Sequence, residues 1–409
     1  MQKINCDVCI VGAGAAGIAA ASSLLKRQPK LKITIVDPSQ THAYQPGWTL
    51  VGAGIFTPQQ TIRKMHKVIP KGVIWIQQSA LKFNAEENTL ILDNQDSVEY
   101  RALVVAPGLK LDFDAIEGLS ETLGKHGVTS NYRFDLAPYT WKLVQQLKRG
   151  TALFTQPPMP IKCAGAPQKA LYLSSDWWQQ QGLQTSINVS FHNAGGALFG
   201  VPAYVPALMD TVNDYDINLQ LNSQLVKVDG ASQTATFNLI KDGAVVGQES
   251  IVFDMLHVCP PQTAHDFMHG QPIVDAAGWV DVKPDTLQNP YYHNVFGLGD
   301  GANTPNAKTA AAVRMQAPVV ALNVISHLAQ QPLTASYDGY GSCPLTVSRN
   351  KIVLAEFGYG GKLLPSFPKW LLDGTQPTRR AWWLKTKVLP SIYWNVMLKG
   401  REWLTNPYK

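Results

Sequence analysis

Charged residues are scarce in this chain of 409 residues: they make up 16% of it, whereas soluble proteins carry about 25%. Hydrophobic residues make up 45% and eleven tryptophans are present, so we expect part of the surface to be apolar. A continuous run of about 18 apolar residues is lacking, which argues against a membrane-spanning helix. The length predicts two domains that share an interface.

Cysteine is scarce as well. The five cysteines are Cys6, Cys9, Cys163, Cys259 and Cys343. Their wide and uneven spacing argues against an extracellular disulfide framework, and the first residues lack the pattern of a secretory signal. Cys6 and Cys9 point to opposite faces of one predicted strand, so we interpret them as core residues, and Cys259 as a packing residue at a strand end.

Most of the chain lacks any excess of positive charge. Residues 365–409 contain eight basic and two acidic residues, which accounts for the whole net charge of +6 and leaves the remainder neutral. A neutral body disfavours nucleic-acid binding. The basic tail also holds five tryptophans, a composition typical of an amphipathic segment at an anionic membrane surface, although a hydrophobic tail that joins subunits is the alternative.

The N-terminal residues predict a nucleotide-binding βαβ unit. Apolar strands are expected over residues 4–11 and 32–37, with a helix over 15–26 between them. Gly12, Gly14 and Gly17 form G-x-G-x-x-G at the turn, where glycine permits a tight bend and close approach of a pyrophosphate. Asp37 ends the second strand, where a ribose hydroxyl needs an acceptor.

Two later segments, residues 104–108 and 297–305, indicate FAD rather than NAD. The first ends a strand, and the second forms a strand-to-helix turn that directs a helix N-terminus toward a flavin. This bipartite pattern resembles the two-dinucleotide-domain flavoproteins, which are glutathione reductase-like. The predicted cofactor-binding residues are Gly12, Gly14, Ala15, Ala16, Gly17, Asp37, Gln45, Pro107, Gly108, Gly299, Asp300 and Lys308. No metal site is predicted.

A second glycine fingerprint is missing after the strand that begins near Thr151. The segment TALFTQPPMPIKCAGAP offers no phosphate cradle for NADH and holds Cys163 in its place. A predicted helix from Gln168 and the ammonium of Lys169 both favour a thiolate at Cys163. Cys343 lies in a Gly/Ser/Pro segment, YGSCPLT, which we expect to be an accessible loop. We therefore take Cys163, Cys343 and Lys169 as candidate catalytic residues.

Several longer motifs carry a resemblance to the sulfide:quinone oxidoreductases, and specifically to the type that includes the animal mitochondrial enzyme. They span nearly the whole chain: HAYQPGWTLVGAG, GKHGVTSNY, KCAGAPQK, GDGANTPNAKTAAAV, GSCPL, EFGYGG and LPSIYWNVMLKG. The resemblance implies that Cys163 and Cys343 form a disulfide, or one bridged by an additional sulfur, beside FAD. Hydrosulfide would attack Cys343, and the released Cys163 thiolate would pass electrons to the flavin.

The implied partners are hydrogen sulfide, ubiquinone or menaquinone, a small thiol or other sulfur acceptor, and a membrane surface; a homo-oligomer stays open. Phe357 and Tyr359 are candidates for holding the quinone ring, with ordinary core packing as the alternative. We expect a peripheral membrane protein at the cytoplasmic face of a bacterial inner membrane. Two other functions stay open: a type II NADH:quinone oxidoreductase, and a non-catalytic flavin redox sensor.

The predicted fold class is α/β, with two Rossmann-like dinucleotide-binding domains and a C-terminal amphipathic membrane-interface region. We divide the chain into an FAD-binding domain over residues 1–119, a second Rossmann-like domain over 120–294, a return to the FAD-binding domain over 295–345, and a quinone- and membrane-binding region over 346–409.

Overall fold

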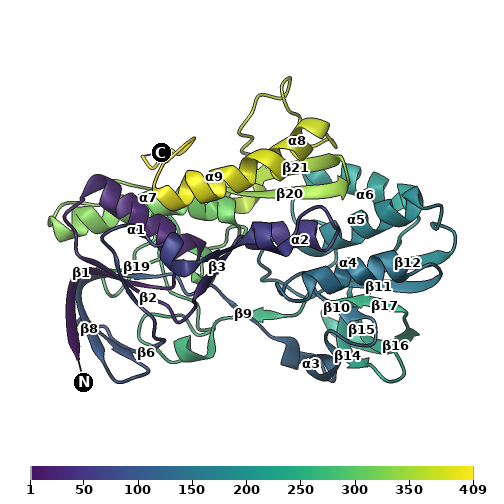
Figure 1. Cartoon of the computed structure of the whole chain (residues 1–409), viewed down its shortest axis with the longest axis horizontal. Helices are drawn as coiled ribbons and strands as arrows, with labels where there is room; N and C mark the ends of the chain where they lie inside the picture. Colours follow the sequence, from purple (N-terminus) through teal and green to yellow (C-terminus); the bar gives the residue numbers. More distant parts are fainter. Residues whose placement is uncertain (1, 409) are drawn as a thin grey trace.

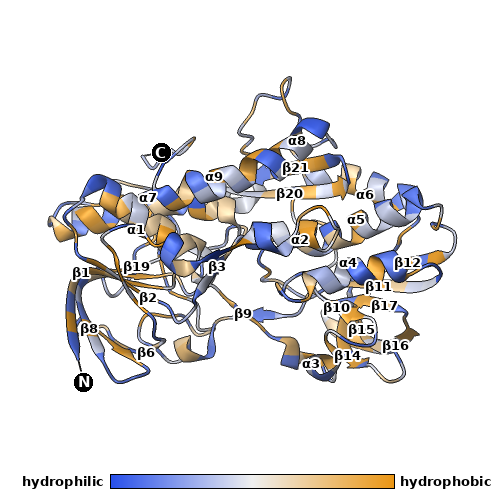
Figure 2. Cartoon of the chain, in the orientation of Figure 1, coloured by the Kyte–Doolittle hydropathy of each residue, from blue (hydrophilic) through white to orange (hydrophobic). Residues whose placement is uncertain are grey.

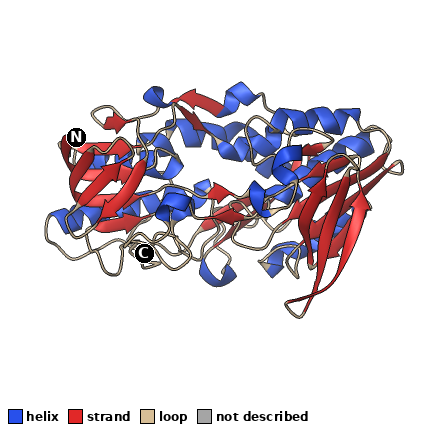
Figure 3. Cartoon of the chain, turned by 90° about the horizontal axis from the view of Figure 1, so that it is seen from below, coloured by secondary structure: helices blue, strands red, loops and turns tan. Residues whose placement is uncertain are grey.

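The computed structural model describes residues 2–408 and contains two largely parallel sheets that lie side by side (Figure 1). Figure 3 shows the two largest groups of strands at opposite ends of the molecule, with helices, loops and a few further strands between them. The hydrophobic colour of Figure 2 concentrates in the strands, because these are covered by helices or loops. The fold is therefore mixed α/β, as predicted.

The first sheet has the order β5-β2-β1-β8-β7-β6, and β19 pairs with β8. Its strands are β1 (Lys3–Val11), β2 (Ile33–Val36), β5 (Ile74–Ile76), β6 (Ala80–Asn84), β7 (Thr89–Leu92), β8 (Ser97–Val105) and β19 (Val295–Gly297). Pairing is parallel among β5, β2, β1, β8 and β19, and antiparallel along β8, β7 and β6. β19 brings the chain back to this sheet, beside β8, after an excursion of almost 190 residues.

Helix α1 (Ala15–Arg27) follows β1 directly, and it packs against α7 (Ala310–Leu328). The turn between β1 and α1 requires glycine: Gly12 has φ +100°, and a Cβ there would lie 2.3 Å from the Ala106 carbonyl oxygen. A Cβ at Gly17 would lie 1.8 Å from the Gly12 carbonyl oxygen, so the helix can approach the strand only with glycine there.

The second sheet has the order β10-β17-β11-β12-β13 and is parallel throughout. Its strands are β10 (Val128–Thr129), β11 (Gly150–Gln156), β12 (Ile187–Asn193), β13 (Asn218–Leu221) and β17 (Met255–His257). Helices α4 (Ala137–Gln146), α5 (Ala166–Gln180) and α6 (Val205–Asp214) accompany it, and the strands β14 (Ser223–Asp229), β15 (Thr234–Lys241) and β16 (Ala244–Val252) form a separate antiparallel sheet.

After α7 the chain forms a hairpin of β20 (Gly341–Ser348) and β21 (Lys351–Phe357), and then α8 (Arg379–Trp383), a π-helical turn over Leu384–Val388, and α9 (Leu389–Asn395). Cys343 lies in β20 and is only 2% exposed, so our prediction of an accessible loop is wrong. The segment reads as a loop because Gly, Ser and Pro dominate it, yet pairing with the apolar strand β21 and packing against α5 bury it.

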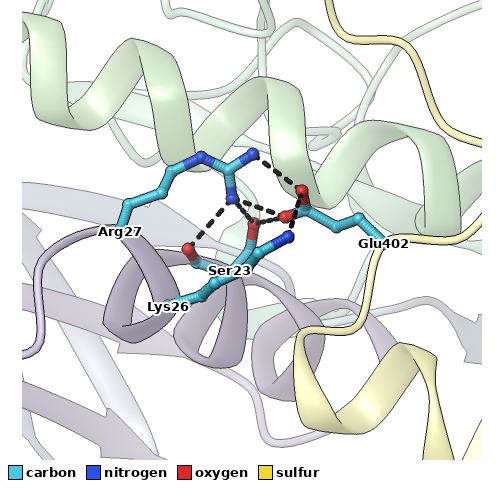
Figure 4. Close-up of polar contacts among 4 residues, drawn as sticks. All are labelled: Ser23, Lys26, Arg27 and Glu402. Atoms are coloured by element: carbon cyan, nitrogen blue, oxygen red, sulfur yellow. Dashed lines mark hydrogen bonds and ion pairs between the residues drawn. The ribbon is translucent and has the colours of Figure 1, made fainter.

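The end of the chain is fastened to α1 by one carboxylate (Figure 4). Glu402 accepts hydrogen bonds from Arg27 (2.5 and 2.8 Å), Ser23 Oγ (2.6 Å) and Lys26 Nζ (3.1 Å). Ser22 Oγ also donates to the Leu398 carbonyl. Among residues 2–408, no helix is both long enough and apolar enough to cross a bilayer.

Candidate functional site

A cavity of about 550 Å³ runs along the carboxyl ends of the first-sheet strands, where open parallel sheets hold their ligands. Its wall combines the β1–α1 turn, the ends of β2 and β8, the start of α5, the turn before α7, and the C-terminal helices. The cavity therefore joins segments from the beginning, middle and end of the chain.

Most of the predicted cofactor-binding residues line this cavity: Gly12, Gly14, Ala15, Ala16, Asp37, Gln45, Pro107, Gly108, Asp300 and Lys308. A Cβ at Gly14 would meet open space, so the backbone there faces the cavity freely. Asp37 Oδ2 accepts from the Ala13 N–H at 2.6 Å and Oδ1 from the Ser39 N–H at 2.8 Å, so this side chain also holds the turn in place.

Gly17 and Gly299 lie behind the wall and shape it. Gly17 serves the helix–strand contact described above. Gly299 has φ +77°, and its N–H donates to Gln316 Oε1 at 2.9 Å, which fixes the turn that presents Asp300 to the cavity.

Asp300 and Lys308 lie close together in the segment that precedes α7. Lys308 Nζ donates to the carbonyl oxygens of Asp300 (2.8 Å) and Ala302 (2.7 Å) and lies 4.6 Å above the Trp279 ring centroid. Burial raises the pKa of Asp300 and lowers the pKa of Lys308, because each charge is removed from water. The cavity thus holds a fixed cation beside the second predicted nucleotide segment.

The three predicted catalytic residues lie together: Cys163 and Lys169 line the cavity, and Cys343 is buried beside Cys163. Cys163 Sγ is 3.7 Å from Cys343 Sγ, and Lys169 Nζ is 3.0 Å from Cys163 Sγ. Lys169 is buried, and it comes from the first turn of α5, which starts three residues after Cys163. A Cβ at Gly165 would lie 2.7 Å from Cys343 Sγ, so glycine at the helix start makes room for the second thiol.

Cys163 is held in a strained and well-anchored backbone. Its φ of +50° is left-handed, which is unusual for a residue with a side chain, and such strain clusters at functional sites. Its N–H donates to the Lys308 carbonyl at 2.8 Å, and its own carbonyl accepts from Ala166. The thiol is thereby tied both to α5 and to the turn of the first domain.

The two thiols differ in acidity. A hydrogen bond from Cys343 and the positive charge of Lys169 hold the pKa of Cys163 well below its usual range, although burial opposes them. The same hydrogen bond and burial raise the pKa of Cys343, since that thiol is the donor. Of the two reduced thiols, Cys163 is therefore the one that loses its proton more readily.

Two further lysines belong to this site and were missed from the sequence. Lys385, which we counted as part of the basic tail, is buried in the π-helical turn, donates to the Pro46 carbonyl at 3.1 Å and lines the cavity. Burial, with the charge of Lys169, lowers its pKa to about 8. Lys162 Nζ donates to Gln45 Oε1 at 2.7 Å. Its position next to Cys163 in the sequence could have indicated that Lys162 belongs to the site.

The predicted quinone residues do not reach the cavity. Phe357 packs edge-on against Phe199, and the Tyr359 hydroxyl donates to the Pro284 carbonyl at 2.7 Å; neither lines the wall. Phe367 does, together with Ile392, Tyr393, Met397, Trp403 and Leu404 of the tail. Phe357 is the neighbour of Glu356, which does line the cavity, and successive residues of a strand point to opposite faces.

Buried polar atoms in the cavity wall fit a ligand with many hydrogen-bonding groups. Both amide atoms of Asn131, Oγ1 of Thr49 and Nε1 of Trp48 are buried without a hydrogen-bond partner. Such atoms normally have partners. With the open backbone at Gly14 and the cation of Lys308, they match the polar edge and phosphates of FAD.

Comparison with known proteins agrees with this arrangement. Residues 6–144 match the family model "Pyridine nucleotide-disulphide oxidoreductase". The chain is 39% identical to the mitochondrial sulfide:quinone oxidoreductase of Mus musculus, over 97% of this chain and 87% of the relative, and 41% identical to that of Dictyostelium discoideum, over 98% and 89%. The crystal structure of the sulfide:quinone oxidoreductase from Aquifex aeolicus shares the fold, with a TM-score of 0.78, 20% identity, and coverage of 98% and 92%.

Proposed function

This chain belongs to the sulfide:quinone oxidoreductase family, and from that premise we propose that Cys163 and Cys343 carry sulfide oxidation in it. The resemblance seen in the sequence motifs is thereby confirmed, and with it an FAD-dependent oxidoreductase. The roles of individual residues, the sulfur acceptor and the site of quinone binding are proposals.

The contact of Lys169 with Cys163, beside Cys343, carries this assignment. In the oxidised pair, hydrosulfide attacks the Cys343 sulfur; a new S–S bond forms there and the Cys163–Cys343 bond breaks. Cys343 becomes a persulfide, and Cys163 leaves with the electron pair as a thiolate. Lys169 stabilises this leaving group, since its ammonium lies 3.0 Å from the sulfur. The sulfur of a small thiol then attacks the outer sulfur of the Cys343 persulfide; the Cys343 S–S bond breaks, the acceptor leaves as a persulfide, and Cys343 is again a thiol.

FAD, when bound along the cavity, would supply the oxidant: it would take up the two electrons released when Cys163 and Cys343 re-form their disulfide, and a quinone would receive them in turn. The chain's own contribution is to hold the Cys163 thiolate within the cavity wall and to surround the reacting atoms with positive charge from Lys169, Lys385 and Lys308. The tail residues Ile392, Met397 and Trp403 offer an apolar wall for the quinone ring, which replaces our prediction of Phe357 and Tyr359. We further propose that the enzyme works as a peripheral protein on a membrane surface.

The same geometry disfavours the two alternative functions, a type II NADH:quinone oxidoreductase and a non-catalytic flavin redox sensor. In the second sheet, the connection from β11 to α5, where a pyridine nucleotide would bind, is occupied by Cys163 and its neighbours. A redox sensor would need neither a lysine beside the thiolate nor a cavity that continues into apolar tail residues.

Anaerobic stopped-flow spectroscopy tests the proposal. Sulfide is expected to bleach the flavin of the purified protein within seconds, NADH to leave it oxidised, and Cys163→Ala to abolish the sulfide response. Cys6→Ala serves as the control, because Cys6 is buried in β1, away from the cavity. Bleaching by NADH, or an undiminished sulfide response in Cys163→Ala, would refute the proposed chemistry.

A further inference from the structure

A second cavity, of about 440 Å³, lies between residues 55–63 and the C-terminal helices. Gln60 and Arg63 form one side of it, and Trp382, Lys387 and Trp394 belong to the other. None of these five residues lines the catalytic cavity. The proposed chemistry leaves this second cavity without a role.

Arg63 is fixed at the edge of this cavity. Its guanidinium carbon lies 4.8 Å from the ring centroid of Trp394, and Nη1 donates to the Ile62 carbonyl at 2.9 Å. Stacking on an aromatic face orients an arginine while leaving its other N–H groups free for an anion. Phosphate oxygens are the acceptors that such a fork binds best.

The charges around the cavity have one sign. Within residues 2–408, neither Arg63 nor Lys387 takes part in a salt bridge, and both are exposed. Residues 38–85 contain five basic residues and no Asp or Glu. The cavity therefore repels cations and attracts anions.

The neighbouring surface is apolar. Trp383, next to Trp382 in α8, is 62% exposed, and Trp370 is 82% exposed. Exposed tryptophans beside basic residues are typical of the headgroup level of a bilayer. A small free anion would gain nothing from these side chains, whereas a lipid phosphate carries acyl chains that they can contact.

We propose that the second cavity binds the phosphate headgroup of an anionic phospholipid, with Arg63 and Lys387 as its ligands and Trp382 and Trp394 as its walls. The site rests on the proposed membrane association but not on the redox chemistry, so its test can succeed or fail independently of sulfide oxidation. In the assembled enzyme it would set the depth and orientation at which the C-terminal helices meet the membrane.

The experiment measures binding of the FAD-loaded, full-length protein to two kinds of vesicle: phosphatidylcholine alone, and an equal mixture of phosphatidylcholine and phosphatidylglycerol. The double variant Arg63→Gln/Lys387→Gln is compared with Lys64→Gln/Lys67→Gln. The second pair removes the same charge from exposed lysines of the same segment that do not line the cavity. Sulfide oxidation with a water-soluble quinone verifies that each variant is folded.

The cavity variant is expected to bind the mixed vesicles about tenfold more weakly than the control pair, with activity toward the soluble quinone unchanged. An equal loss in both pairs would mean diffuse attraction to the surface and would overturn the site. Inorganic phosphate provides the third arm: if millimolar phosphate displaces the protein from vesicles as well as a soluble phosphatidylglycerol does, the cavity is a small-anion site and the lipid assignment fails.

Discussion

The sulfur of Cys163 and the ammonium of Lys169 are 3.0 Å apart inside the protein, where a charge pair is much stronger than in water. Lys169→Gln removes the positive charge and keeps a hydrogen-bond donor. We expect the pKa of Cys163 to rise and alkylation of the reduced protein by iodoacetamide at neutral pH to slow on the order of tenfold. The measurement is the alkylation rate across a pH series.

Lys142→Gln is the matched control, because Lys142 is an exposed lysine of α4. Its pH series should superimpose on that of the unchanged protein. If Lys169→Gln also left the series unchanged, Lys169 would be a packing residue, and the acidity of Cys163 would depend on Cys343 alone.

Lys385 makes the stability of the folded protein depend on pH. Burial lowers its pKa from 10.5 to about 8, so the unfolded chain binds its proton more tightly than the folded protein does. Below pH 8 the lysine is charged in both states and destabilises the fold; this penalty disappears as the pH rises from about 8 to 10.5. Lys385→Met should therefore stabilise the protein at pH 7 by roughly 1–3 kcal/mol, and less at pH 10.

Denaturant unfolding of the oxidised enzyme at the two pH values measures this difference. Lys387→Met is the control, since Lys387 lies two residues away on the same turn but is exposed. A stability gain at Lys385 that did not change with pH would show that the methionine merely packs better. The same variant should lose sulfide oxidation activity, because the ammonium belongs to the catalytic cavity.

Among the elements, the last residues of the chain depend on the carboxylate of Glu402. Burial alone would raise the pKa of Glu402, but the hydrogen bonds from Arg27, Ser23 and Lys26 lower it. The contact therefore stabilises the fold at neutral pH and is lost as the pH falls through the lowered pKa. Arg27→Gln should release the tail, and trypsin should then cleave after Lys399 and Arg401 several-fold faster at neutral pH.

Lys30→Gln is the control for this experiment. It removes one trypsin site and one positive charge from the exposed chain just beyond α1, where no contact with Glu402 exists. Cleavage rates followed by mass spectrometry should match those of the unchanged protein. Equal rates in Arg27→Gln would mean that other tail contacts, such as Ser22 with Leu398, hold the segment by themselves.

The sequence predicts elements that depend on interactions between nearby residues, and it does not predict features that depend on residues far away in the chain. β1, α1 and β2 could be predicted because their apolar periodicity and glycine turn lie within 36 residues. Cys343 could not be placed, since its burial depends on β21 and α5 rather than on its own neighbours. Lys385 was likewise counted as a surface charge, because the thiols near it belong to residues 163 and 343, which are far away in the sequence.

Domain limits show the same effect. Our division places residues up to 294 in the second domain, whereas Met268, Ile273, Val280 and Leu287 pack in the core of the first sheet. These residues form few regular strands, so the hydrophobic periodicity of the sequence could not indicate to which domain they belong. We propose that the return to the FAD-binding domain begins near residue 266, before β19.

At the scale of the whole molecule, the catalytic cavity couples the two ends of the chain. Gly12 and Gly14 of the nucleotide turn and Tyr393 and Trp403 of the tail line the same space. His42 connects them directly: its Nδ1 bonds to the Ala13 carbonyl at 3.0 Å and its Nε2 to the Tyr393 hydroxyl at 2.6 Å. A ligand that fills this cavity therefore contacts both the first turn and the tail.

Because coupling between two equilibria is reciprocal, FAD and the tail contact should stabilise each other by the same factor. FAD is expected to slow trypsin cleavage after Arg401, and Arg27→Gln is expected to weaken FAD binding, each by roughly tenfold. Arg27 ends a helix of 13 residues whose first turn meets the cofactor, about 18 Å away, so the substitution cannot act on the phosphates directly.

Flavin fluorescence titrations of the apoprotein and its Arg27→Gln variant give one factor, and cleavage rates with and without FAD give the other. Equal factors mean that FAD binding and docking of the tail form one cooperative unit. If FAD slowed cleavage while Arg27→Gln left its affinity unchanged, the protection would come from the wall residues Tyr393 and Trp403, and the Glu402 contact would serve the tail alone.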